Sequence, residues 1–142
     1  MAKPIPEGHN AICPYLVVTS ANGLIEFLKK TFDAVEVDRL EPPGGPVFHA
    51  EVRIGDSIVM MGEAMGGSTF PGQVHCYVPD VDATYKRALA AGGTSVREPM
   101  TMFYGDRISM VKDAWQNVWA ISTHVEDVSK EEMARRMASQ KK

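Results

Sequence analysis

A short run of polar and aromatic side chains has the spacing to bind or act on a small molecule. Gln73, His75 and Tyr77 alternate along the chain, so on an extended strand they point to the same face. When the sequence is shifted by sixty residues, Tyr15 falls on His75. Convergent amide, imidazole and phenol groups in a cavity can fix the orientation of a bound organic molecule. We therefore expect these four residues to line a ligand site.

The same shift reveals a repeat that covers most of the chain. Residues 16–22 fall on residues 76–82, and both are strand-like runs that end in residues able to cap a helix. A helical stretch, a short β-rich piece and a hairpin ending in an apolar strand follow each run. A unit of this length is too small to bury its own apolar face, so the two copies should share a core. The ligand site is then expected in the cleft between them.

The repeat predicts a single α+β domain over residues 1–142. Module 1 is expected over about 11–63 and module 2 over about 73–124, with a glycine-rich linker at 64–72. A capping box that begins at Ser129 predicts a C-terminal helix over about 129–139, outside the repeat.

Hydrophobic period and turn residues predict the elements within each module. Asp80 or Asp82 can cap the second helix. In module 1 we expect a strand at 11–18, a helix from about 22 to 32, a turn at 41–46 and a hairpin of strands 49–54 and 57–61. In module 2 we expect a strand that begins at 73, a helix at 83–91 and strands at 94–97, 108–112 and 118–124.

The composition indicates a soluble globular protein, because 44% of the 142 residues are hydrophobic and 23% are charged. No segment reaches the roughly 20 apolar residues of a membrane helix, and residues 1–6 lack the apolar core of a signal peptide. A net charge of −3 with scattered basic residues argues against a nucleic-acid partner. Cys13 and Cys76 fall on opposite strand faces, so we expect no disulfide and a cytoplasmic location.

Segments from nearly the whole chain carry a family resemblance: Pro6-Glu7-Gly8, Pro14-Tyr15-Leu16, residues 75–82 (HCYVPDVD), Tyr104-Gly105-Asp106-Arg107, 111–113 (VKD) and 118–128 (VWAISTHVEDV). In these segments the chain resembles PhnB-like proteins of the glyoxalase/bleomycin-resistance superfamily, which have the vicinal oxygen chelate fold. The resemblance implies two tandem βαβββ modules, a mixed curved sheet with flanking helices, an enclosed cavity and assembly as a dimer. The fold hosts lyases, isomerases, dioxygenases and non-catalytic drug-binding proteins, so it implies no single reaction.

The resemblance also implies where a metal would bind in the relatives that use one. The corresponding positions here are Cys13, Met60, Gln73 and Ala120. An alanine supplies no donor atom, a thioether is too soft for Mg²⁺, Mn²⁺ or Ni²⁺, and one neutral amide cannot hold a divalent cation. We therefore expect no metal at this position and no other cofactor, which argues against glyoxalase I and extradiol dioxygenase chemistry.

Several aromatic residues outside the strand row are further candidates. Phe103 and Tyr104 resemble a family segment near the cavity mouth, and Trp115 lies in a turn where a large ring could meet a ligand or a partner chain. Trp119 is expected in the core on alternation alone. Asp106 and Arg107 are expected to form a local turn with surface charge. A third strand row, Ala120, Ser122 and His124, could add polar groups to the cavity.

The leading functional hypothesis is a small-molecule-binding protein of the bleomycin-resistance type that acts as a homodimer. Its ligand-binding residues would be Tyr15, Gln73, His75, Tyr77, Phe103, Tyr104 and Trp115. The alternative is a lyase, isomerase or dioxygenase of the same superfamily with relocated metal or catalytic residues, in which His75 is a base or ligand and a tyrosine or Arg107 polarises the substrate. A purely structural or regulatory dimer is the third possibility.

Overall fold

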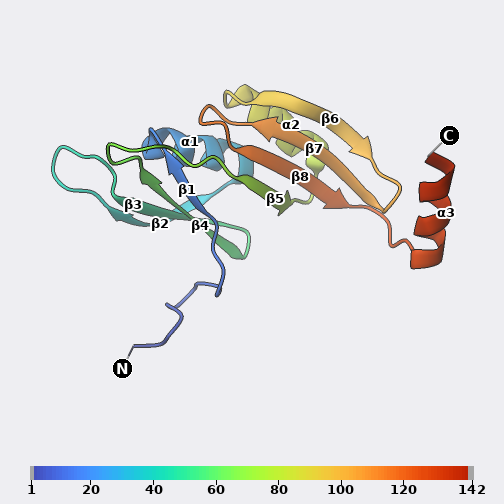
Figure 1. Ribbon diagram of the computed structural model, residues 1–142, viewed down its shortest axis with the longest axis horizontal. Helices are drawn as coiled ribbons and strands as arrows, with labels where there is room; N and C mark the ends of the chain where they lie inside the picture. The colour runs from blue at the N-terminus through green and yellow to red at the C-terminus, as the bar shows by residue number, and fades with distance from the viewer. Residues whose placement is uncertain (1, 141–142) are drawn as a thin grey trace.

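The computed structural model describes residues 2–140, which form eight strands and three helices (Figure 1). In chain order they are β1 (Tyr15–Val18), α1 (Ala21–Phe32), β2 (Val35–Leu40), β3 (His49–Ile54), β4 (Ser57–Glu63), β5 (Gln73–Tyr77), α2 (Val81–Ala90), β6 (Thr94–Thr101), β7 (Asp106–Lys112), β8 (Val118–His124) and α3 (Lys130–Gln140).

The strands form two four-stranded mixed sheets with the same topology. Sheet A has the order β1-β4-β3-β2 and sheet B has the order β5-β8-β7-β6. In each sheet the first strand of the module pairs in parallel with the last, and the other neighbours are antiparallel. This arrangement confirms the predicted α+β fold of two βαβββ modules.

The two sheets have one face covered by α1 and α2 and one face without helices, which we call the open face (Figure 1). The helix α3 lies beyond the far end of sheet B, and the N-terminal segment leaves the body from the start of β1 (Figure 1). Both pieces therefore extend the molecule beyond the two modules.

The core lies between the helices and the sheets and is shared by both modules. Leu16 and Val18 of β1 are buried, while Tyr15 on the opposite face of the strand is exposed. Phe32 at the end of α1 meets Trp119 of β8 with ring centroids 5.5 Å apart. Trp119 is fully buried, as predicted. This contact between rings from different modules explains why neither repeat needs to bury its apolar face alone.

Side-chain caps set where the helices begin. The Ser20 hydroxyl accepts from Gly23 N at 3.1 Å at the start of α1, and the Asp80 carboxylate accepts from Ala83 N at 3.1 Å at the start of α2. Of the two predicted caps, Asp80 is thus the one used. At the start of α3 the Ser129 hydroxyl accepts from Glu132 N at 3.1 Å, which is one of the two hydrogen bonds of the predicted capping box, while the Glu132 carboxylate pairs with Arg135 and Arg136.

Two predicted strands have different bounds because of proline. The strand expected at 11–18 begins only at Tyr15, after Pro14, which has no N–H to donate to a ladder. The strand expected at 94–97 continues to Thr101 through Pro99. This is possible because β6 is an edge strand and its register shifts between Arg97 and Met100.

Two further sequence expectations can be compared with the structure. Cys13 and Cys76 are both free thiols. Within residues 2–140, no helix combines the length and the apolar character that crossing a bilayer requires.

Candidate functional site

The predicted strand row lies on the open face of sheet B. Gln73, His75 and Tyr77 are exposed, whereas Val74 and Cys76 point toward the other face and are half-buried. The rings of His75 and Tyr77 lie side by side, with centroids 4.9 Å apart. The alternation of β5 therefore brings the three predicted residues together on one surface.

Tyr15 occupies the equivalent position on sheet A and does not join the row within one chain. It pairs with Met60 of β4, as His75 pairs with Ala120 of β8. The Tyr15 ring lies 5.6 Å from the His49 ring, measured between centroids, and its hydroxyl lies over Gly62. A side chain at position 62 would collide with this phenol, so the absence of a side chain at Gly62 leaves room for the Tyr15 ring.

A buried carboxylate supports the row on sheet B. The Tyr77 hydroxyl donates to Asp106 Oδ2 at 2.9 Å, and His124 Nδ1 lies 2.8 Å from Asp106 Oδ1. The other nitrogen of His124 lies 2.8 Å from the exposed carboxylate of Asp127. A chain of hydrogen bonds thus runs from the surface to the exposed ring of Tyr77.

These contacts change the proton affinities of their members. Burial raises the pKa of Asp106, but hydrogen bonds from His124 and Tyr77 outweigh it, and the pKa falls below its ordinary value. The hydrogen bond to Asp106 raises the pKa of Tyr77. Hydrogen bonds to Asp127 and to Asp106 raise the pKa of His124. The phenol is therefore a hydrogen-bond donor held in place, not a base.

A second buried carboxylate lies on sheet A. The Glu51 side chain is 8% exposed and lies between two imidazoles, with Oε1 2.7 Å from His9 Nε2 and Oε2 2.8 Å from His49 Nε2. The remaining nitrogen of His49 lies 3.4 Å from the Tyr15 hydroxyl. Glu51 therefore fixes the orientation of His49 toward Tyr15 and holds the N-terminal segment through His9.

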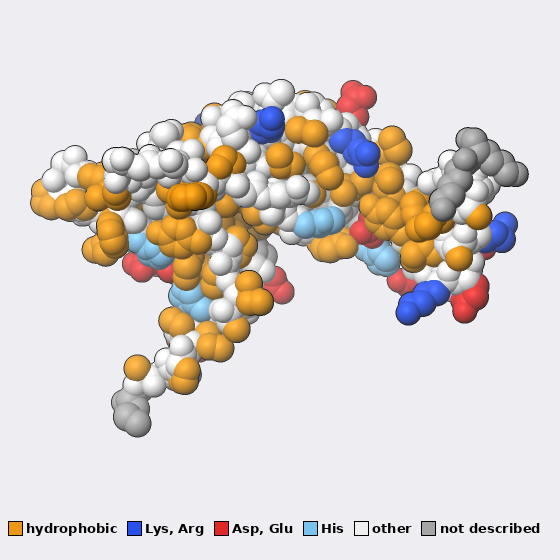
Figure 2. Space-filling model, in the orientation of Figure 1, with side chains coloured by type: hydrophobic (Ala, Val, Ile, Leu, Met, Phe, Trp, Pro, Cys, Tyr) orange, Lys and Arg blue, Asp and Glu red, His pale blue; other side chains and the backbone are white. Residues whose placement is uncertain are grey.

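Burial and hydrogen bonding have opposite effects on the pKa of Glu51. Burial raises this pKa, but the hydrogen bonds from His49 and His9 outweigh burial, so the pKa of Glu51 lies below its ordinary value. The hydrogen bond to Glu51 and the one to the Glu7 carbonyl raise the pKa of His9. In Figure 2 the histidine side chains follow the lower side of the molecule, away from α1 and α2.

Phe103 and Tyr104 form the turn between β6 and β7. Their rings meet edge to face with centroids 5.2 Å apart. Arg136 of α3 donates to the Phe103 carbonyl at 3.1 Å and also pairs with Glu126 at 2.9 Å. The C-terminal helix therefore holds this turn at the end of sheet B.

Trp115 does not lie with the other predicted ligand residues. Its ring packs against Gly23 of α1, on the helix-covered side of the sheets, and its backbone N–H donates to the buried Asp113 carboxylate at 2.9 Å. The turn tryptophan therefore has a packing partner within its own chain. Within one chain, Trp115 therefore lies apart from the open-face row, although the sequence suggested it as a ligand contact.

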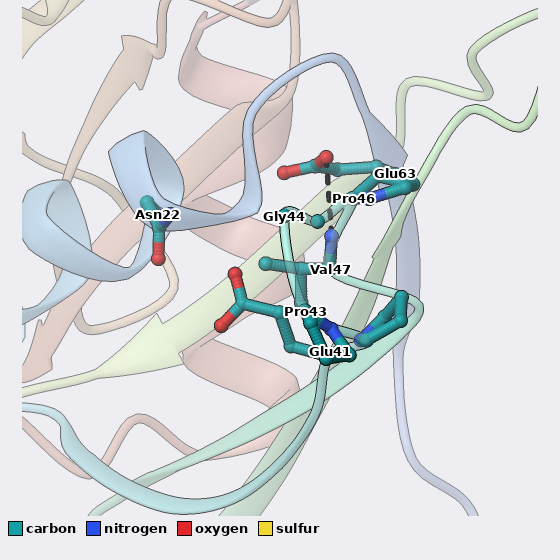
Figure 3. A pocket seen from close by; sticks show the side chains of 9 residues that line it. Asn22, Glu41, Pro43, Gly44, Pro46, Val47 and Glu63 are labelled. Atoms are coloured by element: carbon teal, nitrogen blue, oxygen red, sulfur yellow. Dashed lines mark hydrogen bonds between the residues drawn. The ribbon is translucent and has the colours of Figure 1, made fainter.

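One cavity, of about 670 Å³, lies between the start of α1 and the loop 41–47 (Figure 3). There Glu63 accepts from Val47 N at 3.3 Å and from Ala21 N at 3.0 Å, so its carboxylate ties the loop to the helix. A second cavity, of about 520 Å³, lies where the modules meet and includes His75 and Tyr77 in its lining.

The donor atoms at the family's metal positions do not fit a divalent cation. Met60 and Ala120 lie on the last strands of the two modules, opposite Tyr15 and His75. A thioether and a methyl group at these positions leave too few hard donors. In the described part of the chain, no three His, Cys, Asp or Glu side chains are arranged to hold a metal ion.

The structure adds four residues to the site that the sequence did not assign to it. Asp106 was expected as a surface charge, but it is buried, because Tyr77 and His124 supply hydrogen bonds that offset its desolvation. The signal for Glu51 and His49 was their spacing of two on a predicted strand, which places both on one face. Nothing local indicates His9, whose partner is 42 residues away in sequence.

Comparison with known proteins gives consistent matches. The family described as the Glyoxalase/Bleomycin resistance protein/Dioxygenase superfamily matches residues 9–121. An uncharacterized protein of Mycobacterium bovis is 35% identical over 144 aligned positions, covering 92% of this chain and 93% of the relative. An uncharacterized protein of Mycobacterium tuberculosis is also 35% identical, with 92% and 84% coverage.

Many solved structures are similar to this chain in three dimensions, TioX and FosX among them. TioX from Micromonospora sp. ML1 has a TM-score of 0.69 and 25% identity, covering 82% of this chain and 99% of that chain. The fosfomycin resistance protein FosX from Listeria monocytogenes, complexed with Mn(II) and sulfate, has a TM-score of 0.63 and 17% identity, with 90% and 97% coverage. At 17% identity, the similarity to FosX shows a shared fold and nothing about function.

Proposed function

The chain belongs to the Glyoxalase/Bleomycin resistance protein/Dioxygenase superfamily, and from that premise we propose that it binds a small aromatic or amphipathic molecule on its open face without the metal of the catalytic relatives. Tyr15, Gln73, His75, Tyr77, Phe103 and Tyr104 are the proposed contacts. The absence of suitable donors at the metal positions favours binding over the superfamily's metal-dependent reactions. Within the superfamily, the segments quoted above favour the PhnB-like group.

The neighbouring rings of His75 and Tyr77 are the observation that carries this proposal. The two rings lie 4.9 Å apart between centroids and are tilted by 32°, and Tyr77 is 62% exposed, so an aromatic ligand can pack against them from solvent. The buried Asp106 carboxylate holds the phenol, so little side-chain entropy is lost when a ligand binds. His75 adds a hydrogen-bonding group at the same surface.

We further propose that the protein acts as a homodimer. Exposed aromatic side chains include Tyr15, Phe70 and Tyr77, and such surfaces in water favour association. Tyr15 and the row on β5 belong to different sheets, so a two-fold dimer can bring Tyr15 of one subunit to the row of the other. Sedimentation equilibrium at micromolar concentration should give about twice the chain mass of 15.6 kDa.

We also propose that the protein is intracellular, because its two free thiols are typical of a reducing compartment.

Substitution of His75 tests the binding proposal. In calorimetric titrations with a panel of aromatic and cationic drugs, His75→Ala should weaken binding by about 1 to 3 kcal/mol, because its hydrogen bond to the ligand is lost in a partly dry site. Lys86→Ala, an exposed change on α2, is the control. Denaturation of both variants separates binding from folding. Unchanged affinity with a large loss of stability would make His75 a structural residue and remove the main support for the site.

A second candidate, proton-transfer catalysis, is favoured by one specific arrangement. The Tyr15 phenol lies 3.4 Å from His49, which Glu51 orients from behind, so a hydroxyl, a base and an orienting carboxylate stand in line. Such a unit could exchange the α-proton of a carbonyl compound. Deuterium uptake by a panel of enolisable ketones and aldehydes in heavy water would support it if Tyr15→Phe abolished the uptake. No uptake with the unaltered protein would leave binding as the proposed function.

A further inference from the structure

The cavity of about 520 Å³ at the junction of the two modules has a character different from the open face. One wall is the turn of the β3–β4 hairpin and the other is the edge strand β5. His75 and Tyr77 stand at its mouth, and its inner wall reaches the helix-covered side of the sheets through Phe32 and Trp119. Cavities of this size between structural units are a common place for small-molecule sites.

The inner wall is apolar and aromatic. Phe32, Val59 and Trp119 are buried, and the two rings lie 5.5 Å apart. Cys76 adds a thiol to the same lining. Burial raises the pKa of this thiol, so it stays neutral near pH 7 and behaves as a small apolar group. The inner wall therefore favours the body of an apolar molecule.

The mouth carries one fixed negative charge. Asp56 is the only lining residue with a carboxylate, and its Oδ1 accepts from the Ser57 hydroxyl at 2.8 Å. Among the described residues it has no ion-pair partner within 4.0 Å. Its charge also raises the pKa of Cys76, so the carboxylate acts on the cavity and not only on solvent. A cationic group at the mouth would complement it.

We propose that this junction cavity is a second small-molecule site, which meets the open face only at His75 and Tyr77, and that it takes a lipophilic amine. The aromatic body of the ligand lies against Phe32 and Trp119, and its ammonium group lies at the mouth beside Asp56. This goes beyond the proposed function, because neither Asp56 nor the inner wall belongs to the open-face contacts. Apolar burial supplies most of the affinity, and the carboxylate selects the charge of the ligand.

The two cysteines give a direct readout. Cys76 lines the junction cavity, and Cys13 lines a different one of about 300 Å³ under the N-terminal segment. Iodoacetamide alkylation of each thiol can be followed by peptide mass spectrometry in the presence of 1-naphthylmethylamine. We expect the amine to slow the alkylation of Cys76 by about tenfold at saturation, since bound ligand excludes the reagent from the buried wall. Alkylation of Cys13 should stay unchanged and is the internal control.

Matched ligands and variants test the role of charge and of the cavity. The neutral 1-naphthalenemethanol should protect Cys76 more weakly than the amine, and 1-naphthaleneacetate least. Asp56→Asn should weaken the binding of the amine about two- to fivefold, which is the effect of losing an exposed charge pair. The binding of the alcohol should not change. Asp38→Asn, on β2, is the charge-matched control.

Ser57→Phe should block the cavity, with Ser68→Phe in the linker as its control, and thermal denaturation checks that each variant folds.

The outcomes divide clearly. Selective protection of Cys76 by the amine, reduced in Asp56→Asn and lost in Ser57→Phe, supports the proposal. Equal protection of both thiols, equal binding of amine and carboxylate, or protection that grows with protein concentration in the absence of ligand would overturn it. The last result would assign the cavity to a second copy of the chain. Gln73→Ala reports on the open face alone, because Gln73 is exposed on that face and does not line the junction cavity, so failure at either site can be recognised separately.

Discussion

The phenol of Tyr77 donates a hydrogen bond of 2.9 Å to the carboxylate of Asp106, although the tyrosine is among the most exposed aromatic residues and the aspartate is buried. The exposed ring is therefore anchored from below by a charge that solvent hardly reaches. Because His124 holds the other oxygen of the same carboxylate, the anchor itself has a fixed orientation. A ring held in this way can contact a ligand without first losing its own freedom.

Replacing the anchor should destabilise the fold as well as free the ring. In Asp106→Asn, the amide NH₂ must face either Tyr77 or His124, and both of these are donors to the native carboxylate. We expect the free energy of unfolding to fall by about 1 to 3 kcal/mol, as for a buried group that loses a partner. Urea denaturation measures it, with Asp38→Asn as the control. Equal stability of the two variants would mean that solvent replaces the lost hydrogen bonds.

The contact of His9 with Glu51 should make stability depend on pH in a defined window. The folded pKa of His9 is raised above its ordinary value of 6.5, so its contribution is complete below that pH and is lost as pH rises through the folded pKa. The folded pKa of Glu51 is lowered below 4.5, so its contribution is complete above that pH and is lost as pH falls through the folded pKa. Both contributions are complete only between pH 4.5 and pH 6.5.

Denaturation of the protein and of His9→Gln across this range tests the prediction. The difference in unfolding free energy should be largest inside the window and should shrink on both sides of it. Lys3→Gln, in the same N-terminal segment, should show no such profile, because its contact with Glu7 is exposed. A difference that does not change with pH would show that the contact of His9 is one of packing and not of charge.

The fold could be predicted from the sequence because the patterns that specify its strands and helices are local and occur twice in the chain. The run at 16–22 and its copy at 76–82 each carry a strand, a cap and a helix start, and Ser20 and Asp80 cap the helices in the structure. Among the elements with predicted bounds, differences of more than two residues occur only at the two strands affected by proline, and Pro99 is tolerated at an edge that the sequence does not mark. The helix expected at 83–91 and the strands expected at 57–61 and 108–112 differ by one or two residues, and β2 had no predicted bounds.

The candidate site could be predicted only in part, because the carboxylates that hold its side chains come from strands that are distant in sequence. Alternation alone placed Gln73, His75 and Tyr77 on one face. The contact of Tyr77 with Asp106 spans 29 residues, and that of His9 with Glu51 spans 42. No local pattern encodes such pairs, since the burial that makes a carboxylate significant is a property of the folded sheet.

The close approach of Trp115 to Gly23 predicts a steric effect of a single methyl group. A Cβ at position 23 would lie 2.5 Å from Cζ2 of the Trp115 ring. Gly23→Ala should therefore lower the free energy of unfolding by about 1 to 3 kcal/mol, as overpacking does, despite the better helix propensity of alanine. Gly67→Ala is the matched control, because its Cβ would meet nothing within 4 Å. If Gly23→Ala stabilised the protein, the ring would have to move freely.

The carboxylate of Asp113 should be the most sensitive polar group in the second module. It is buried and accepts four hydrogen bonds of 2.9 Å, from the backbone N–H groups of Trp115 and Asn117, from Asn117 Nδ2 and from Trp119 Nε1. An amide in its place can accept through one oxygen only, and its NH₂ group would face two donors. Asp113→Asn should therefore cost about 3 kcal/mol of unfolding free energy, near the upper end for hydrogen bonds to a charged group.

Fluorescence gives this last prediction a readout of its own. In Asp113→Asn either the indole N–H of Trp119 or the backbone N–H of Trp115 loses its acceptor, so tryptophan emission should change even under conditions where the variant is fully folded. Asp127→Asn provides the comparison, because that carboxylate is fully exposed and lies far from either tryptophan in the hydrogen-bond network. It should leave both emission and stability nearly unchanged. An Asp113→Asn variant with native emission and native stability would show that the turn 113–117 is held by its backbone alone, and that the buried charge adds nothing.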